Sequence, residues 1–308
     1  MRLEGLWAAI PTPWDAHGRL DEGILERNIE RYLASGVDGV YTTDSDGEFY
    51  AIELAEFRQL VAVFSRKIGA TTLGAAVGVT WSHTQGIIDR LRVALEHGVP
   101  LVHVAFPYWM PLASGDVDRF FADLATAVPE ARWVHYNTSN TGPLLAGRDY
   151  ARLAAAFPDQ LVGSKQGATD VMQFAEIIEE SPHLAHFVVE YNLVPGFILG
   201  ARGVYSYWVN TLPAWERRWV DACTGGDWET AWRMQLKLWK WERTHIAPLR
   251  QAGHRHAIVG KARAALSGFL EDSGRTRAPY YPVDAQLQAA LKRAFDAFWA
   301  DEIQTSSK

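Results

Sequence analysis

Short runs of apolar, β-branched and aromatic residues recur along the chain, and helical patterns separate them. The amphipathic stretch EGILERNIERYLASG, for example, carries apolar residues three to four positions apart and ends at a glycine, which is typical of a helix. Strands that alternate with helices in this way predict an α/β fold, a (β/α)8 TIM barrel. The expected strands are LWAAI (6–10), VDGVY (37–41), TTLGAAV (71–77), PLVHVAF (100–106), RWVHY (132–136), LVGSK (161–165), HFVVE (186–190) and RGVYS (202–206).

A doubly wound open sheet is the main alternative, but it usually carries a glycine-rich phosphate loop after the first strand. Here that position reads IPTPWDAHG, which favours the barrel. The last two expected strands are close together in sequence, so the helix between them should be small. From about residue 212 the pattern becomes helical only. We therefore expect a barrel with the catalytic site over residues 1–211 and a C-terminal helical region over residues 212–308.

Composition narrows the class of protein. The 308 residues carry a net charge of −6 and no basic stripe, which argues against a nucleic-acid partner. Cys223 is the only cysteine, so an intramolecular disulfide cannot form. No run of 18 apolar residues and no signal-peptide pattern is present, so we expect no membrane partner and a cytoplasmic protein.

Active sites of TIM barrels form at the carboxyl ends of the strands, so polar residues there are candidates. The sixth expected strand ends at Lys165, a cation on a long stem. Taken alone, a polar residue at a strand end more often belongs to the solvated surface or to a turn than to an active site. His103 and His135 lie within strands without a third ligand at a neighbouring strand end, so no metal site is expected. The histidines of HRH (254–256) are expected to be exposed.

Taken in order, the strand-end segments resemble the Schiff-base-forming barrel family of dihydrodipicolinate synthase and N-acetylneuraminate lyase. The resemblance covers nearly the whole chain. It implies a homo-oligomer (a tetramer or dimer) that acts on a small carbonyl substrate with no cofactor beyond a covalent Schiff base. The matching segments are GLWAAIPTPWDAHGRLD, the DGE turn after strand two, PYW after strand four, YN…TG after strand five, Gly-x-Lys of strand six, GARGVYS of strand eight and KARAALSG…RAPYYPV near the end.

The resemblance implies that Lys165 condenses with a substrate ketone and that Tyr136 shuttles protons. Ser45 stands where the family has a hydroxyl that relays protons to this tyrosine. Burial at the barrel mouth would lower the pKa of the Lys165 amine, because a dry environment disfavours the ammonium. The protonated imine would then act as the electron sink for making or breaking a carbon–carbon bond. The expected substrate-binding residues are Asp46, Gly47, Trp109, Asn140, Glu190 and Tyr205.

The turn after strand two departs from the family pattern. The family reads Gly-Thr-Thr-Gly-Glu and holds a 2-oxo acid carboxylate there, whereas this chain reads DSDGE. Asp46 replaces the second hydroxyl and Asp44 the leading glycine. An ionised Asp46 would repel a carboxylate, so either it points away or a pyruvate-type carboxylate is not bound in the usual way. An alternative alignment, which slides the motif along the chain and requires an insertion before Gly47, gives the carboxylate-binding role to Thr42 and Thr43; we call it the sliding alternative.

Two further departures argue against the lysine-pathway synthase. That branch has an arginine after its Tyr-Asn pair, whereas this chain has a loop one residue shorter, with Asn140 near that place. It also inserts a tyrosine from the neighbouring subunit after strand four, where this chain has Trp109. Four aromatic residues could form a wall around a bulky substrate: Trp109, Tyr191, Tyr205 and Trp208. For Trp208, packing in the protein core is an equally good interpretation.

The function expected is therefore a carbon–carbon lyase of the class I aldolase type, acting on a 2-oxo acid or related carbonyl compound. A sugar-acid dehydratase that uses the same iminium is the alternative, since DGEFYAI is similar to the turn of that branch. A third reading is a non-catalytic carbonyl-binding barrel. The retained Lys165, Tyr136 and Ser45 argue against it.

Overall fold

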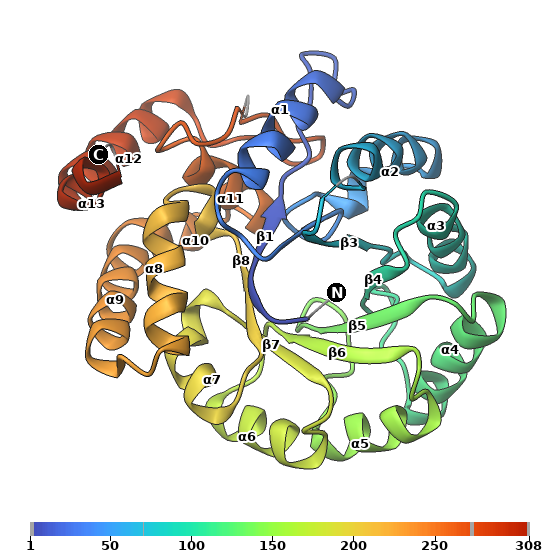
Figure 1. The fold of residues 1–308 in the computed structure, drawn as a ribbon. Coiled ribbons are helices and arrows are strands. Elements are labelled where there is room, and N and C mark those ends of the chain that lie inside the picture. The colour runs from blue at the N-terminus through green and yellow to red at the C-terminus, as the bar shows by residue number, and fades with distance from the viewer. Residues whose placement is uncertain (1–2, 70, 272–273, 307–308) are drawn as a thin grey trace.

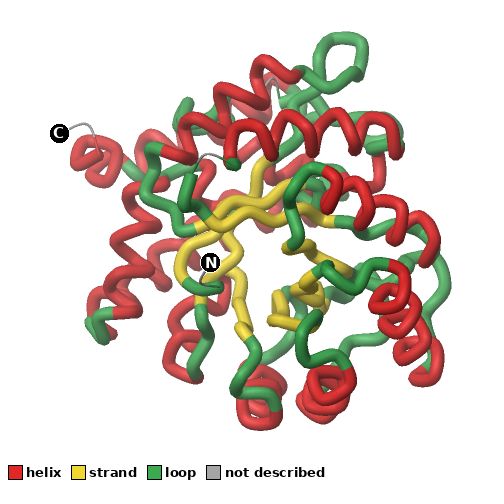
Figure 2. Tube along the Cα trace, turned by 45° about the vertical axis from the view of Figure 1, so that its right-hand side comes forward, coloured by secondary structure: helices red, strands yellow, loops and turns green. Residues whose placement is uncertain are grey.

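Eight short strands form a closed barrel in the computed structural model, which describes residues 3–69, 71–271 and 274–306. All neighbouring strands are parallel, and β8 pairs with β1 to close the ring (Figures 1 and 2). Each strand coincides with one of the predicted runs, so the TIM barrel is confirmed. The strands are β1 (Gly5–Ile10), β2 (Gly39–Thr42), β3 (Gly74–Gly78), β4 (Leu101–Val104), β5 (Arg132–Asn137), β6 (Leu161–Gln166), β7 (Ala185–Val189) and β8 (Gly203–Ser206).

Helices follow the strands and surround them (Figure 1). The helix between the last two strands, α7, has seven residues, in line with the short interval in the sequence. The surrounding helices are α1 (Glu22–Leu33), α2 (Leu54–Ile68), α3 (Thr84–Glu96), α4 (Ser114–Ala127), α5 (Gly147–Ala156), α6 (Val171–Glu180), α7 (Leu193–Leu199) and α8 (Pro213–Thr224). Short 3₁₀ turns lie at η1 (Phe49–Ala51), η2 (Glu190–Asn192) and η3 (Trp208–Asn210).

The remaining helices continue the chain beyond the barrel. They are α9 (Trp228–Trp241), the π-helical turn η4 (Glu242–Ile246), α10 (Ala247–Gln251), α11 (His256–Ala264), α12 (Ala285–Phe298) and α13 (Ala300–Ser306). The boundary expected at residue 212 falls directly before α8, which contacts α7 and β1 and so takes the eighth helical position of the ring. None of the helices in the described ranges is both long and apolar enough to cross a membrane.

Local sequence signals explain where several helices begin. Asp21 precedes α1 and its carboxylate accepts a hydrogen bond from the Ile24 amide at 3.0 Å. Asp170 precedes α6 and accepts from the Gln173 amide at 2.8 Å, while the Gln173 side chain accepts from the Asp170 amide. These caps satisfy amides that a helix leaves without partners at its start.

Large aromatic side chains fill the core. Trp7 of β1 packs inside the barrel against Phe187 and Tyr205, with ring centres 6.1 and 5.7 Å away. A Cβ at Gly39 would lie 2.4 Å from the Trp7 ring, so this wide side chain requires a glycine on the neighbouring strand. Trp208 is fully buried, with its ring centre 5.2 Å from that of Trp299. It is a core residue between the barrel and the C-terminal helices.

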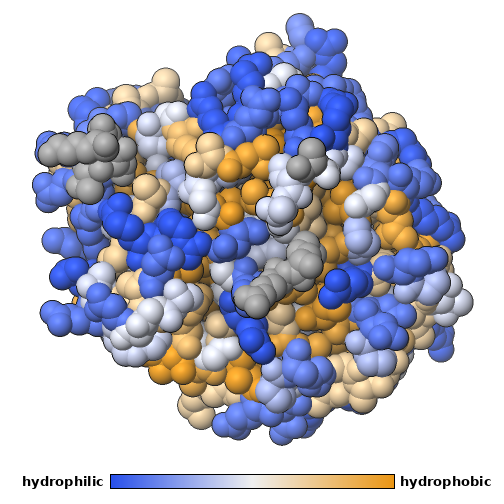
Figure 3. Space-filling model, in the orientation of Figure 1, coloured by the Kyte–Doolittle hydropathy of each residue, from blue (hydrophilic) through white to orange (hydrophobic). Residues whose placement is uncertain are grey.

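A buried ion pair connects α11 with the turn after β2. The Lys261 amine lies 2.6 Å from a Glu48 carboxylate oxygen, and both side chains are almost fully buried. Glu48 also accepts hydrogen bonds from the Trp14 indole at 2.9 Å and from the Arg277 amide at 3.1 Å. The C-terminal region thereby fixes a turn that carries predicted site residues. On the face that Figure 3 shows, hydrophilic side chains gather around the edge and apolar side chains lie between them.

Candidate active site

Lys165 is the fifth residue of β6, and its side chain points into the carboxyl end of the barrel. Only 3% of the residue is exposed. On the adjacent strand β5, Tyr136 is its register partner. The Lys165 amine lies 4.1 Å from the centre of the Tyr136 ring. The predicted nucleophile and the predicted proton shuttle are therefore neighbours.

Four inward-facing side chains form a layer at the level of this amine. They come from the even-numbered strands: Tyr41 of β2, His103 of β4, Lys165 of β6 and Tyr205 of β8. The Lys165 amine donates a hydrogen bond to the Tyr41 hydroxyl at 3.2 Å, and His103 Nε2 lies 3.0 Å from the Tyr205 hydroxyl. TIM barrels fill their interior with such layers from alternate strands. In this chain the layer is polar and hydrogen-bonded.

Asp44 joins this layer from the turn after β2. Its Oδ2 atom lies 2.6 Å from Nδ1 of His103 and 3.7 Å from the Lys165 amine. A Cβ at Gly78 would lie 2.3 Å from Asp44 Oδ1, so the glycine at the end of β3 makes room for this carboxylate. Asp44 is 2% exposed, and its Oδ1 atom has no hydrogen-bond partner among the described residues.

The charge of Lys165 differs from the expectation based on burial. Burial alone would lower the pKa of the Lys165 amine, but the acidic groups of Tyr136, Asp44, Asp46 and Glu190 outweigh it and raise this pKa above its usual value. Burial acts in the expected direction, but the net shift of this pKa is upward, so the expected net lowering is wrong for this chain. The physical reason is that Tyr136 and the buried carboxyl groups close to the ammonium favour its charged form. The free protein holds this proton, and a reaction at the amine must first remove it.

Two cavities that share Tyr136 and His256 as lining residues lie at this end of the barrel. An inner cavity of about 90 Å³ is lined by Lys165 together with Tyr136, Tyr205, Asp46 and Glu190, all of them predicted site residues. An outer cavity of about 420 Å³ continues from Tyr136 and includes the predicted residues Ser45 and Asn140. Tyr191 also lines the inner cavity, as one of the aromatic residues considered for a wall.

Gly47 shapes the turn rather than lining a cavity. A Cβ at this position would lie 2.5 Å from the Thr43 amide nitrogen, and its carbonyl accepts a hydrogen bond from the Thr12 hydroxyl at 2.6 Å. Thr42 and Thr43 are fully buried, and their hydroxyls donate to the carbonyls of Ile10 and Gly78 at 3.3 and 2.8 Å. Since these hydroxyls are bonded to the backbone, the structure does not support the sliding alternative.

Trp109 lies outside both cavities of its own chain. It is 83% exposed, and the adjacent Met110 is 68% exposed. Trp109 is thus a predicted substrate-binding residue that lies on the surface of its own chain, away from both cavities. In contrast, Tyr108 lines the outer cavity of its own chain.

Asp46 does not point away from the site. It is 5% exposed and lines the inner cavity, and its Oδ1 atom lies 3.0 Å from Nε2 of His256 on α11. Burial would raise the pKa of Asp46, but His256, Lys165 and Arg263 lower it below its usual value. Burial raises the pKa of Glu190. The cavity thus contains an ionised carboxylate and a carboxyl group that protonates more readily than usual.

Sequence reasoning missed four residues of the site: Tyr41, Asp44 in its contact with Lys165, His103 and His256. The signal for Tyr41 and His103 was available, because inward-facing residues of alternate barrel strands share a layer, whereas Asp44 reaches that layer from the turn after β2. His256 was expected to be an exposed histidine. Its side chain is indeed 48% exposed, but it also faces Asp46. Its position depends on how α11 folds back over the barrel.

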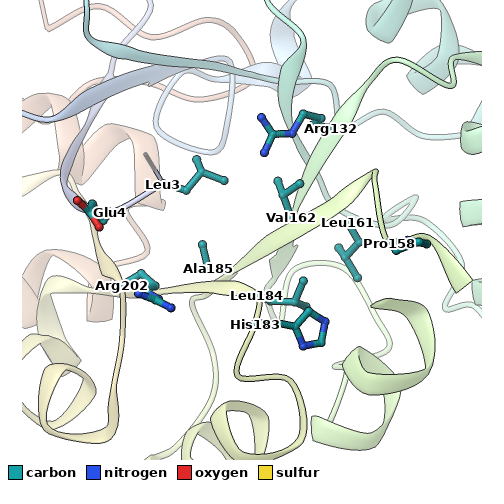
Figure 4. A pocket seen from close by; sticks show the side chains of 10 residues that line it. All are labelled: Leu3, Glu4, Arg132, Pro158, Leu161, Val162, His183, Leu184, Ala185 and Arg202. Atoms are coloured by element: carbon teal, nitrogen blue, oxygen red, sulfur yellow. The ribbon is translucent and has the colours of Figure 1, made fainter. Parts of the chain in front are cut away.

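A cavity larger than the two near Lys165 lies at the opposite end of the barrel. It measures about 580 Å³ and is formed around the starts of β5, β6 and β7, by residues such as Arg132, Val162 and His183 (Figure 4). None of the predicted site residues lines it, and it is more open than the cavities at Lys165. Size alone therefore does not identify the reactive site. Among the residues that the structure describes, no group of three or more His, Cys, Asp or Glu could hold a metal ion.

Comparisons with known proteins agree with this geometry. The model of the dihydrodipicolinate synthetase family matches residues 2–298. A 4-hydroxy-tetrahydrodipicolinate synthase of Acidobacterium capsulatum is 27% identical over 298 residues, which cover 95% of each chain. An uncharacterized DapA-like lyase of Halobacterium salinarum is 26% identical over 291 residues, which cover 94% of this chain and 92% of that protein. The crystal structure of YagE from E. coli K12, a prophage protein of the dihydrodipicolinic acid synthase family in complex with pyruvate, has a TM-score of 0.86 at 21% identity, and the match covers 96% of this chain and 98% of that one.

Proposed function

Since the chain belongs to the dihydrodipicolinate synthetase family, we propose that it is a lyase of the class I aldolase type that forms a Schiff base with a carbonyl substrate at Lys165. The observation that carries this proposal is the buried amine of Lys165, which faces a cavity 4.1 Å from the centre of the Tyr136 ring. A buried amine next to a phenol has the two groups that imine chemistry needs, a nucleophile and a proton donor.

The first proposed step removes the proton of the Lys165 ammonium. Asp44, at 3.7 Å, is the nearest carboxylate for this proton, and His103 on its far side can share it. The neutral amine then attacks the carbonyl carbon, a C=N bond forms, and the carbonyl oxygen leaves as water. The imine takes up a proton and becomes an iminium ion. Because the iminium itself accepts the electron pair of the broken bond, the step needs no metal or organic cofactor.

Tyr136 is proposed to move the protons of the second step. When a carbon–carbon bond next to the iminium breaks, the electron pair enters the C=N system and an enamine results. Tyr136 first gives its proton to the departing carbonyl oxygen, and the resulting phenolate can then take a proton from a substrate hydroxyl and return it to the enamine carbon. Ser45, on the outer cavity with Tyr136, is proposed to relay protons to it. Hydrolysis of the iminium then releases the product and restores the amine.

A dehydratase that uses the same iminium is the second candidate, and one observation favours it. Glu190 lines the inner cavity, and burial raises its pKa. A protonated carboxyl group there could donate its proton to a departing substrate hydroxyl, which would leave as water. Product analysis separates the two reactions, because the lyase yields two carbonyl fragments and the dehydratase yields one dehydrated product.

Reductive trapping tests the proposed function. The protein is incubated with a carbonyl compound, treated with borohydride and digested, and the mass of the Lys165 peptide is measured. The expected result is an adduct on Lys165 that is absent in Lys165→Arg. We expect Tyr136→Phe still to form the adduct but to turn over roughly 10²- to 10⁴-fold more slowly. If no carbonyl compound modifies Lys165 and Lys165→Arg keeps full activity, the proposal is wrong.

The working form is proposed to be a cytoplasmic homo-oligomer of this chain, a dimer or tetramer. The exposed aromatic and apolar side chains after β4 support subunit contact, since Trp109 and Met110 are 83% and 68% exposed. Light scattering coupled to gel filtration would measure the mass in solution. Trp109→Ser is expected to shift this mass towards the single chain, whereas the equally exposed Met172→Ser on α6 would serve as a control.

A further inference from the structure

The positive groups around Lys165 already face carboxylates. The Lys165 amine lies 3.7 Å from Asp44, His256 lies 3.0 Å from Asp46, and the Arg263 guanidinium on α11 lies 2.9 Å from a Glu242 carboxylate oxygen. All of these groups except His256 are nearly buried. None of these three positive groups is left without a negative partner to attract a substrate carboxylate.

Asp46 lines the inner cavity together with Lys165. Only 5% of this residue is exposed. His256, Lys165 and Arg263 lower its pKa below the usual value, although burial acts in the opposite direction. Its Oδ1 atom is shielded from the cavity and lies at ion-pair distance, 3.0 Å, from Nε2 of His256. Because the ionised carboxylate also lines the cavity, its second oxygen can accept a hydrogen bond from a molecule bound there.

The small size of the inner cavity makes this charge decisive. Lys165 and Asp46 both line this cavity of about 90 Å³, so a group bonded to the reactive carbonyl carbon would share a small space with the Asp46 carboxylate. A carboxylate at that position would add a negative charge beside Asp46, and a buried site screens the repulsion poorly. A hydroxyl at the same position can instead donate its proton to Asp46, which gives a charge-assisted hydrogen bond.

Resting on the proposed Schiff-base function, we propose that the substrate carries a hydroxyl, not a carboxylate, beside its reactive carbonyl, and that Asp46 accepts the hydrogen bond of that hydroxyl. The substrate class is then a 1-hydroxyketone or a 2-hydroxyaldehyde. The remainder of the molecule extends into the outer cavity of about 420 Å³, where Arg255 and Asn140 provide polar contacts. Asp46 is thus the residue that sets specificity at the carbonyl end.

Two ketones of three carbons test the proposal, because hydroxyacetone and pyruvate differ only in the group next to the carbonyl. Each is incubated with the protein over a range of concentrations, trapped with borohydride and quantified on the Lys165 peptide. We expect half-maximal labelling at a concentration at least tenfold lower for hydroxyacetone than for pyruvate. Asp46→Asn and Asp46→Thr should move the ratio towards pyruvate by tenfold or more. Asp123→Asn, an exposed aspartate on α4, should leave the ratio unchanged.

The outcomes distinguish the two proposals. If the native chain labels with pyruvate as readily as with hydroxyacetone, or if both Asp46 variants leave the ratio unchanged, the substrate inference is wrong while the Schiff base stands. If neither ketone labels Lys165 in the native chain or in a folded Asp46 variant, the proposed function fails as well. The comparison within the native chain needs no variant, so the substrate inference can be refuted even if an Asp46 substitution prevents folding.

Discussion

Replacing Lys261 by methionine tests how strongly α11 fixes the turn after β2. The Lys261 amine is buried 2.6 Å from Glu48 and also donates to the Thr12 carbonyl at 2.7 Å. In Lys261→Met the Glu48 carboxylate keeps two neutral donors among the described residues, the Trp14 indole and the Arg277 amide. Removing one partner of a buried ion pair leaves an uncompensated charge, which costs about 3–5 kcal/mol.

Urea unfolding, followed by circular dichroism at one fixed protein concentration, measures this loss. The matched control is Lys292→Met, because Lys292 pairs with Asp296 across one helical turn while both side chains are about half exposed. Such an exposed pair is worth at most about 0.5 kcal/mol. We expect Glu48→Gln combined with Lys261→Met to recover part of the stability. If Lys261→Met costs no more than Lys292→Met, the ion pair does not hold the turn.

Three further predictions concern the barrel interior. Burial lowers the pKa of His135 to about 3, so the folded protein keeps this ring neutral while the unfolded chain takes up a proton below pH 6.5. The free energy of unfolding should therefore fall as the pH drops from 6.5 towards 3. In His135→Gln the dependence of this free energy on pH, measured by urea unfolding, should be flatter by up to about 1.4 kcal/mol per pH unit. An unchanged dependence would refute the burial effect. Because Asp44 helps to raise the pKa of Lys165, Asp44→Asn should lower this pKa and allow borohydride trapping to begin at a lower pH than in the native protein. An onset at the same or a higher pH would contradict this reasoning. In Gly78→Ala the new Cβ would lie 2.3 Å from Asp44 Oδ1, so the carboxylate must shift. The pH at which borohydride trapping begins should then move in the same direction as in Asp44→Asn. If trapping begins at the same pH as in the native protein, the position of Asp44 does not depend on this glycine.

The alternation of strands and helices was predictable because each signal is local. An apolar run such as LVGSK and a capped amphipathic helix are specified by neighbouring residues, so all eight strands were found. The position of Lys165 at a strand end and of Tyr136 on the adjacent strand followed from the same pattern together with the family resemblance. The inner cavity then brings three of the other predicted site residues to the amine, namely Asp46, Glu190 and Tyr205.

Contacts between distant segments could not be read from local patterns. His103 meets Asp44 across 59 residues, and no rule of spacing relates the two. The charge of Lys165 was misjudged for the same reason, since burial was visible in the sequence but the carboxylates around the amine were not. His256 faces Asp46 only because the chain returns across the barrel after its eighth strand. The exposed position of Trp109 also depends on geometry that a strand-end pattern does not contain.

Helix α11, with nine residues, serves the site in two ways at once. Its first residue, His256, balances the charge of a cavity wall, and five residues later Lys261 holds the turn on which that wall stands. Changes in this one appended helix can therefore retune which molecules enter while every strand of the barrel stays as it is. Selectivity in such a protein can evolve from outside the ring that performs the chemistry.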